Sequence, residues 1–149
     1  MKTSVLIFTM LFSAATLFSQ DANKEKEAIK MAIQTGYVEG IQNEGDAKKI
    51  DAGIHPDFNL LGVGEKEQMW KLPIKEWKAR QVKKRKAGEL PLPEDKKVSV
   101  EYEFIDITGN AAVAKIKFFV GEEQRYVDYI SLYKFESGWK MVNKIFYAL

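Results

Sequence analysis

Apolar side chains recur every four residues after residue 20, and this spacing predicts a helix over 21–44. The members of its buried stripe are Ile29, Ile33, Tyr37 and Ile41. Gly45 is expected to end this helix, and Asp46 to cap a second, short helix over 47–52. Pro73 suits the first turn of a third helix, which is expected to run from 74 towards 86.

Beyond Lys96 the apolar positions alternate with a period of two, which is typical of strands. Four long strands are predicted over 98–107, 111–120, 125–135 and 139–148, and a shorter one over 58–61. The connections between the long strands are too short for anything but antiparallel neighbours. Helices followed by an antiparallel meander indicate an α+β fold with the helices on one side of the sheet.

The first hairpin of this meander predicts its own register. If Ile107 faces Ala111, then Tyr102 and Phe104 belong to an apolar inner face. The same register sets two glutamates opposite two lysines on the outer face, with Glu101 facing Lys117 and Glu103 facing Lys115.

The strand over 125–135 has two faces that are each half apolar. One face carries Tyr126, Asp128, Ile130 and Leu132, and the other carries Val127, Tyr129, Ser131 and Tyr133. The pattern leaves open which face points inward. Either the sheet curls so that both faces are partly covered, or the outer face meets a second subunit in a homodimer.

Residues 1–20 have the order of a secretory signal peptide. A single lysine precedes an apolar run from Val5 to Phe18, and the composition turns polar at Ser19. This run is shorter than the roughly 20 apolar residues that a membrane-spanning helix needs. We therefore expect a periplasmic or secreted protein with a single mature domain over 21–149 and no membrane span.

Composition narrows the chemistry further. The chain has no cysteine, which excludes disulfides, a lipid-modified cysteine and a thiolate metal site. A formal net charge of +2 at pH 7 gives no electrostatic reason to expect nucleic acid as a partner. The basic run near the end of the third helix, from Lys78 to Lys86, is interpreted as a solvated helix face.

Several segments resemble one known family. They are Glu44-Gly45-Asp46-Ala47, His55-Pro56-Asp57-Phe58, Leu72-Pro73-Ile74-Lys75-Glu76-Trp77, Val127-Asp128-Tyr129-Ile130-Ser131-Leu132 and Gly138-Trp139-Lys140-Met141-Val142-Asn143-Lys144. In these segments the chain resembles the NTF2-like superfamily, and within it the SnoaL-like or "putative lumazine-binding" branch. The resemblance implies an NTF2-like cone in which three N-terminal helices pack on a curved, mainly antiparallel sheet. It does not imply one activity, since the superfamily includes isomerases, cyclases and dehydratases.

Two residues are candidates for acid–base chemistry in such a cone. His55 is the single histidine, and imidazole is the side chain that exchanges protons near neutral pH, although a histidine beside proline also suits a structural role. Asp128 inside the cone would be desolvated, which favours its protonated form. With Tyr102 beside it, such a carboxyl would resemble the oxyanion site of the ketosteroid isomerases. Alternatively, Asp128 points outward and pairs with Lys117 or Lys144.

The aromatic residues are expected to form the core and, in part, the wall of a pocket for a small planar or apolar molecule. The residues expected to contact this ligand are His55, Trp70, Trp77, Tyr102, Phe118 and Asp128. A single histidine without a nearby carboxylate cluster offers too few ligands for zinc, so no metal is predicted, and no motif implies a cofactor.

Two functions of different classes agree with these observations. The favoured one is a non-catalytic, small-ligand-binding or accessory protein of the cell envelope. The alternative is an enzyme of the isomerase, dehydratase or cyclase type, with Asp128 or His55 as the base and Tyr102 as hydrogen-bond donor.

The signal peptide yields a prediction about processing. Mass spectrometry of the envelope fraction should find a chain that begins near Gln20 or Asp21. Recovery of only the full-length chain, from the cytoplasm, would contradict export.

Overall fold

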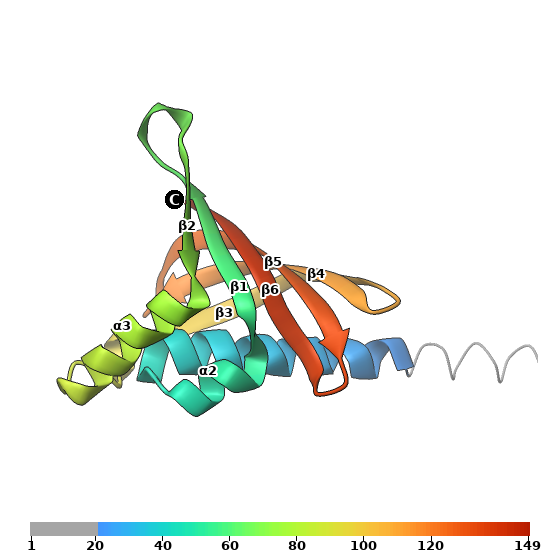
Figure 1. Cartoon of the computed structure of the whole chain (residues 1–149), viewed down its shortest axis with the longest axis horizontal. Coiled ribbons are helices and arrows are strands. Elements are labelled where there is room, and N and C mark those ends of the chain that lie inside the picture. Colours follow the sequence, from blue (N-terminus) through green and yellow to red (C-terminus); the bar gives the residue numbers. More distant parts are fainter. Residues whose placement is uncertain (1–20) are drawn as a thin grey trace, which may run out of the picture.

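The computed structural model describes residues 21–149, so the predicted signal peptide lies outside the described residues. The helices of this part of the chain lie along one side of a curved six-stranded sheet (Figure 1). The α+β cone predicted from the sequence is therefore confirmed.

The first helix covers residues 21–44 and has π-helical geometry over Ile33–Glu44 (η1). All four residues of the predicted stripe are buried. Gly45 ends the helix with a left-handed φ of 63°, and the Asp46 carboxylate accepts hydrogen bonds from two backbone N–H groups at the start of α2 (Ala47–Gly53).

The third helix, α3 (Ile74–Lys86), follows Pro73 as expected. Ile74 and Trp77 anchor its first turns in the core, while the basic residues of its second half are largely exposed. Two single 3₁₀ turns, η2 (Glu65–Glu67) and η3 (Glu94–Lys96), lie in connections. Within residues 21–149, no helix has both the length and the apolar character to cross a membrane.

The sheet has the strand order β2-β1-β6-β5-β4-β3. Its strands are β1 (Ile54–Val63), β2 (Met69–Pro73), β3 (Val98–Thr108), β4 (Ala111–Val120), β5 (Glu123–Phe135) and β6 (Gly138–Ala148). All neighbours are antiparallel except β1 and β6. The sequence predicted the four long strands, but it gave β1 too short a span and did not predict β2, whose residues alternate poorly.

The register predicted for β3 and β4 is correct only as far as Tyr102, which pairs with Ile116. There β3 contains a β-bulge at Glu103, so that Phe104 pairs with Lys115. The extra residue reverses the faces of the rest of the strand. Phe104, expected inside, is therefore 47% exposed, and Ile105 takes its place in the core at 8% exposed.

The inner face of β5 is the one that carries Asp128, which points into the cone together with Ile130 and Leu132. On β6, a second bulge at Val142 shifts the register between the pairs Leu132–Met141 and Ser131–Asn143. Because of this extra residue, Lys144 lies on the inner face, where plain alternation from Met141 would have placed Asn143.

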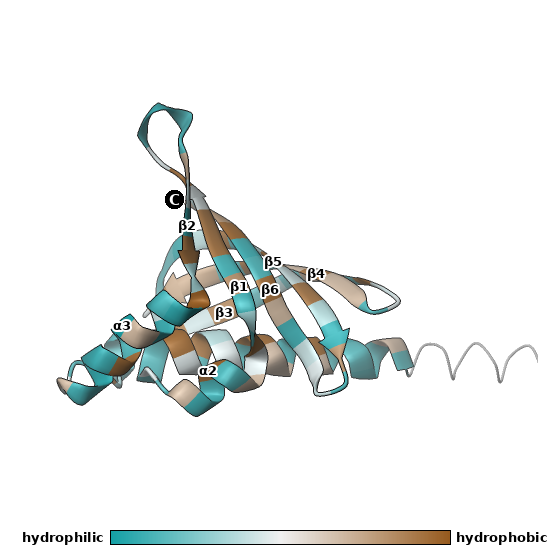
Figure 2. Cartoon of the chain, viewed as in Figure 1, coloured by the Kyte–Doolittle hydropathy of each residue, from teal (hydrophilic) through white to brown (hydrophobic). Residues whose placement is uncertain are grey.

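The core lies between the first helix and the concave side of the sheet. Figure 2 shows apolar positions alternating along the strands, whereas α3 is hydrophilic over most of its length. Near the start of the first helix, the Glu25 carboxylate accepts hydrogen bonds from Lys134 Nζ and Trp139 Nε1, at 2.7 and 2.6 Å. These bonds tie the helix to the hairpin between β5 and β6 and hold the pKa of Glu25 below its ordinary value.

The bulge in β3 yields a prediction about stability. Ile105→Ala should reduce the free energy of unfolding by about 2 to 5 kcal/mol, because it leaves a cavity in the core. Phe104→Ala should cost under about 1 kcal/mol, because that ring is half in solvent. Urea denaturation of the two variants measures the difference, and a larger loss for Phe104→Ala would show that the inner face is assigned incorrectly.

Candidate functional site

A cavity of about 370 Å³ lies between the helices and the inner face of the sheet. It is bounded by the first helix, α3, the segment before β3, and the inner face of the sheet. The lining residues are Tyr37, Gln42, Leu60, Trp77, Leu92, Val98, Phe118, Val120, Tyr126, Lys144 and Phe146. The volume is within the range of pockets that hold small molecules.

Aromatic rings form most of the wall. Tyr37 contacts Trp77 edge-on and Phe118 at a tilt, with ring centroids 6.0 and 5.9 Å apart. Tyr126 stands edge-on against both Phe118 and Phe146, at 5.4 and 5.6 Å. Such rings are held in place by one another and present flat apolar surfaces to a ligand.

A buried charged pair lies against this wall. Asp128 is completely buried, and its Oδ2 accepts a hydrogen bond of 2.9 Å from the Tyr37 hydroxyl. Its Oδ1 is 2.8 Å from Nζ of Lys144, but no well-aligned hydrogen-bond donor reaches it from the described residues. Charge, more than hydrogen-bond alignment, therefore holds the lysine to Asp128.

Lys144 is the charged member of the cavity lining, and only 4% of it is exposed. Its Nζ is 5.0 Å from the ring centroids of both Tyr37 and Phe146, within the range of cation–π attraction. Burial lowers the pKa of Lys144, and the neighbouring carboxylate of Asp128 opposes this effect. Burial and the same carboxylate raise the pKa of Tyr37 well above its ordinary value, so its hydroxyl stays protonated and donates.

Three different elements bring this group together. Tyr37 comes from the apolar stripe of the first helix, and Asp128 from the regular alternation of β5. Lys144 pairs with Ile130 across the β5–β6 ladder, so it is the diagonal neighbour of Asp128 on the inner face. This neighbourhood exists only because the bulge at Val142 turns the lysine inward.

Only some of the residues that the sequence proposed for ligand contact line the aromatic cavity. Trp77 and Phe118 line the cavity, and Asp128 lies directly behind Lys144. Trp70 is outside it and packs on Phe146, with ring centroids 6.0 Å apart. The hydroxyl of Tyr102 donates to the backbone carbonyl of Lys30 at 3.1 Å, so the hydroxyl that reaches Asp128 is that of Tyr37 instead.

His55 lies elsewhere. Its ring stacks on Phe135 with centroids 4.7 Å apart, and its Nδ1 accepts a hydrogen bond from the backbone N–H of Asp57. It borders a separate, smaller cavity of about 210 Å³ next to the start of α3. The predicted combination of His55, Tyr102 and Asp128 in one site is therefore not formed.

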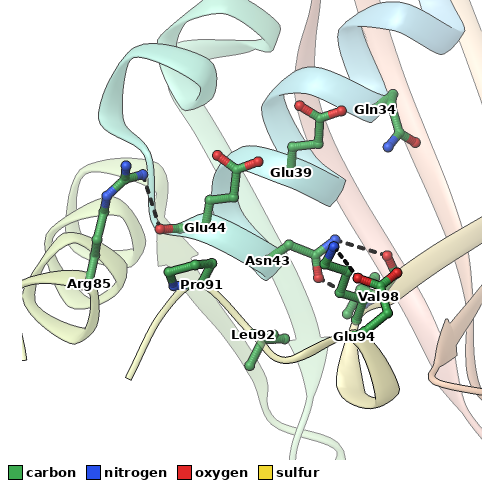
Figure 3. A pocket seen from close by; sticks show the side chains of 10 residues that line it. Gln34, Glu39, Asn43, Glu44, Arg85, Pro91, Leu92, Glu94 and Val98 are labelled. Atoms are coloured by element: carbon green, nitrogen blue, oxygen red, sulfur yellow. Dashed lines mark hydrogen bonds and ion pairs between the residues drawn. The ribbon is translucent and has the colours of Figure 1, made fainter. Parts of the chain in front are cut away.

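A second large cavity, of about 550 Å³, shares the lining residues Leu92 and Val98 with the first, and Figure 3 shows the side chains around it. Asn43 pins this segment, since its amide both donates to and accepts from the backbone of Val98, at 3.0 and 2.8 Å. The negative charges in the wall of this cavity are already compensated, because Glu39 and Glu44 both form ion pairs with Lys49. It is a polar surface groove, and its buried polar side chain, Asn43, is already committed to the backbone of Val98.

The described residues hold no cluster of three or more histidine, aspartate or glutamate side chains suited to a metal ion. The polar groups of the aromatic cavity are the ammonium of Lys144 with the Asp128 carboxylate behind it, the hydroxyls of Tyr37 and Tyr126, and the amide of Gln42. The sequence had indicated Tyr37 only as a core residue and Lys144 only as an outward partner for Asp128.

Comparison with solved structures supports the fold. An NTF2-like protein of unknown function from Shewanella baltica OS155 is 24% identical, with a TM-score of 0.62 over 85% of this chain and 94% of that one. An NTF2-like protein of unknown function from Silicibacter pomeroyi DSS-3 is 13% identical, with a TM-score of 0.67 over 86% and 98%. No curated protein matches the chain.

A family match covers nearly all of the described chain. The family described as putative lumazine-binding matches residues 24–147, a range that contains both Tyr37 and the Asp128–Lys144 pair. Since this range is most of the sequence, the chain belongs to the putative lumazine-binding family, and its fold is the cone of the NTF2-like structures.

Proposed function

We propose that this protein is an exported, non-catalytic, small-ligand-binding protein of the cell envelope, and that its ligand occupies the aromatic cavity. The observation that carries the proposal is a cavity of about 370 Å³ with an aromatic wall and one buried ammonium group, that of Lys144. Pockets for small molecules combine a mostly apolar lining with a few polar groups that fix orientation. Export rests on the order of charged, apolar and polar residues over 1–20.

The arrangement of the polar groups favours binding over catalysis. A general base is most often an imidazole or a carboxylate, and it must lie within hydrogen-bond reach of the substrate. Asp128 is fully buried behind the cavity wall, with Tyr37 on one oxygen and Lys144 beside the other. His55 borders a different cavity. The cavity thus offers a ligand a donor, and no free base.

The family's description suggests a pteridine-like ligand, since lumazine is a planar bicyclic compound with ring carbonyl groups. A bicyclic ring system suits walls made of Tyr37, Trp77, Phe118, Tyr126 and Phe146. We therefore include lumazine among the compounds to be tested.

The binding test uses N-phenyl-1-naphthylamine, a neutral aromatic dye whose fluorescence rises in apolar surroundings. It should bind the mature chain, and Val120→Trp should weaken its binding about tenfold or more, because the indole fills the cavity that Val120 lines. Lumazine should displace the dye if the ligand is pteridine-like. Fluorescence titration measures each affinity.

The matched control is Val113→Trp, which adds the same bulk to the opposite face of the same strand. It should leave dye binding unchanged. Circular dichroism establishes that both variants are folded, since overpacking costs about 1 to 3 kcal/mol. Equal dye affinity in the folded Val120→Trp variant and the wild type would overturn the proposal that this cavity is the binding site.

We also propose that the protein forms a homodimer through the outer face of its sheet. Tyr129 and Ile145 are cross-strand partners on this face and are 39% and 50% exposed, and Tyr147 beside them is 67% exposed. An exposed apolar patch of this kind is typical of an interface. Analytical ultracentrifugation should find a dimer that Ile145→Lys dissociates, while Met31→Lys, at an exposed position on the first helix, should not. A monomeric wild type would contradict the dimer.

A further inference from the structure

The electrostatics of the cavity select the chemical class of ligand more narrowly than its shape does. We propose that the site binds a planar molecule through a neutral carbonyl oxygen that accepts a hydrogen bond from Lys144, and that Asp128 makes the site discriminate against carboxylates. This inference rests on the proposed binding function and specifies the group that is recognised.

The ammonium group of Lys144 has N–H donors that no described residue occupies. An ammonium group carries three N–H donors and no acceptor. Within residues 21–149 its one ionic partner is Asp128, and no well-aligned hydrogen bond joins the two. The rings of Tyr37 and Phe146, with centroids 5.0 Å from Nζ, attract its charge without accepting a conventional hydrogen bond. Since Lys144 also lines the cavity, a donor remains for a ligand that enters it. The recognised group must therefore be a hydrogen-bond acceptor.

The charges of Lys144 and Asp128 determine which acceptor the site can hold. Lys144 and Asp128 are 4% and 0% exposed, so the pair is removed from water, and the two opposite charges compensate each other at 2.8 Å. No other charged side chain lines the cavity among the residues that the structure describes. A carboxylate ligand would therefore leave one negative charge without a partner in a desolvated site, which is costly. A neutral carbonyl accepts the same hydrogen bond and adds no charge.

Among the described residues, the rest of the cavity wall is uncharged. Apart from Lys144, the polar lining side chains are Tyr37, Gln42 and Tyr126. The Tyr37 hydroxyl already donates to Asp128. No lining side chain carries a second positive charge that could attract an anion. The aromatic rings favour a conjugated ring system, so the ligand class is a planar aromatic ketone, lactam or related neutral carbonyl compound.

The test compares three naphthalenes of the same shape that differ in one substituent. They are 2-acetylnaphthalene with a neutral carbonyl, 2-naphthoate with a carboxylate, and 2-ethylnaphthalene without an acceptor. The wild type should bind 2-acetylnaphthalene about tenfold more tightly than either of the others, since a hydrogen bond from a charged donor contributes an effect of this order. Isothermal titration calorimetry of the mature chain measures the three dissociation constants.

Asp128→Asn provides the decisive variant. It keeps the shape of the side chain and an oxygen for Tyr37, but it leaves the charge of Lys144 uncompensated. The variant should reverse the preference, so that 2-naphthoate binds about tenfold more tightly than 2-acetylnaphthalene. The matched control is Asp106→Asn, the same charge change at an exposed position of β3, and it should leave the wild-type order unchanged.

Lys144→Met supplies an independent check if Asp128→Asn fails to fold. It should bind 2-acetylnaphthalene and 2-ethylnaphthalene with similar affinity, because no donor distinguishes them. Binding of 2-naphthoate to the wild type as tightly as the ketone would overturn the inference, while the proposed function would stand. An unchanged order in folded Asp128→Asn would also overturn it. Failure of all three compounds to bind the wild type would instead overturn the proposed binding function.

Discussion

The contact of Tyr37 with the buried Asp128–Lys144 pair is the interaction on which the arrangement of the cone depends. It connects the first helix to two strands of the sheet at a point that water does not reach. Removing two charges from water is costly, and close pairing with an added hydrogen bond offsets that cost. The group therefore fixes how the helix lies across the sheet and leaves the aromatic cavity beside it.

The bulges of the sheet are the second constraint, because each one changes which side chains face the core. The bulge at Glu103 moves Phe104 to the surface, and the bulge at Val142 moves Lys144 inside. Bulges also bend and twist the strands that contain them, which helps the sheet to curve around the helices. The bulges thus help to shape the sheet, and the one at Val142 also turns Lys144, the charged side chain of the cavity lining, inward.

The NTF2-like cone positions a cavity without prescribing its use, since one fold can carry many activities. In this chain the cone is combined with a particular set of polar groups: an ammonium that faces the cavity, a carboxylate behind it, and a hydroxyl committed to that carboxylate. Such a set can orient a ligand and select its charge. Among the described residues, the groove beside Asn43 and the small cavity beside His55 have no buried charged side chain comparable to Lys144.

The sequence by itself determined the helices, the four long strands and the family resemblance, because spacing, caps and turns act over a few residues. Gly45, Asp46 and Pro73 are examples of such local signals. It also indicated Trp77 and Phe118 as pocket residues. Only the tertiary structure decided that Tyr37, and not Tyr102, reaches Asp128, and that Lys144 points inward. The physical reason is that a bulge shifts alternation by one residue, and the pattern of a half-apolar strand does not reveal where that shift occurs.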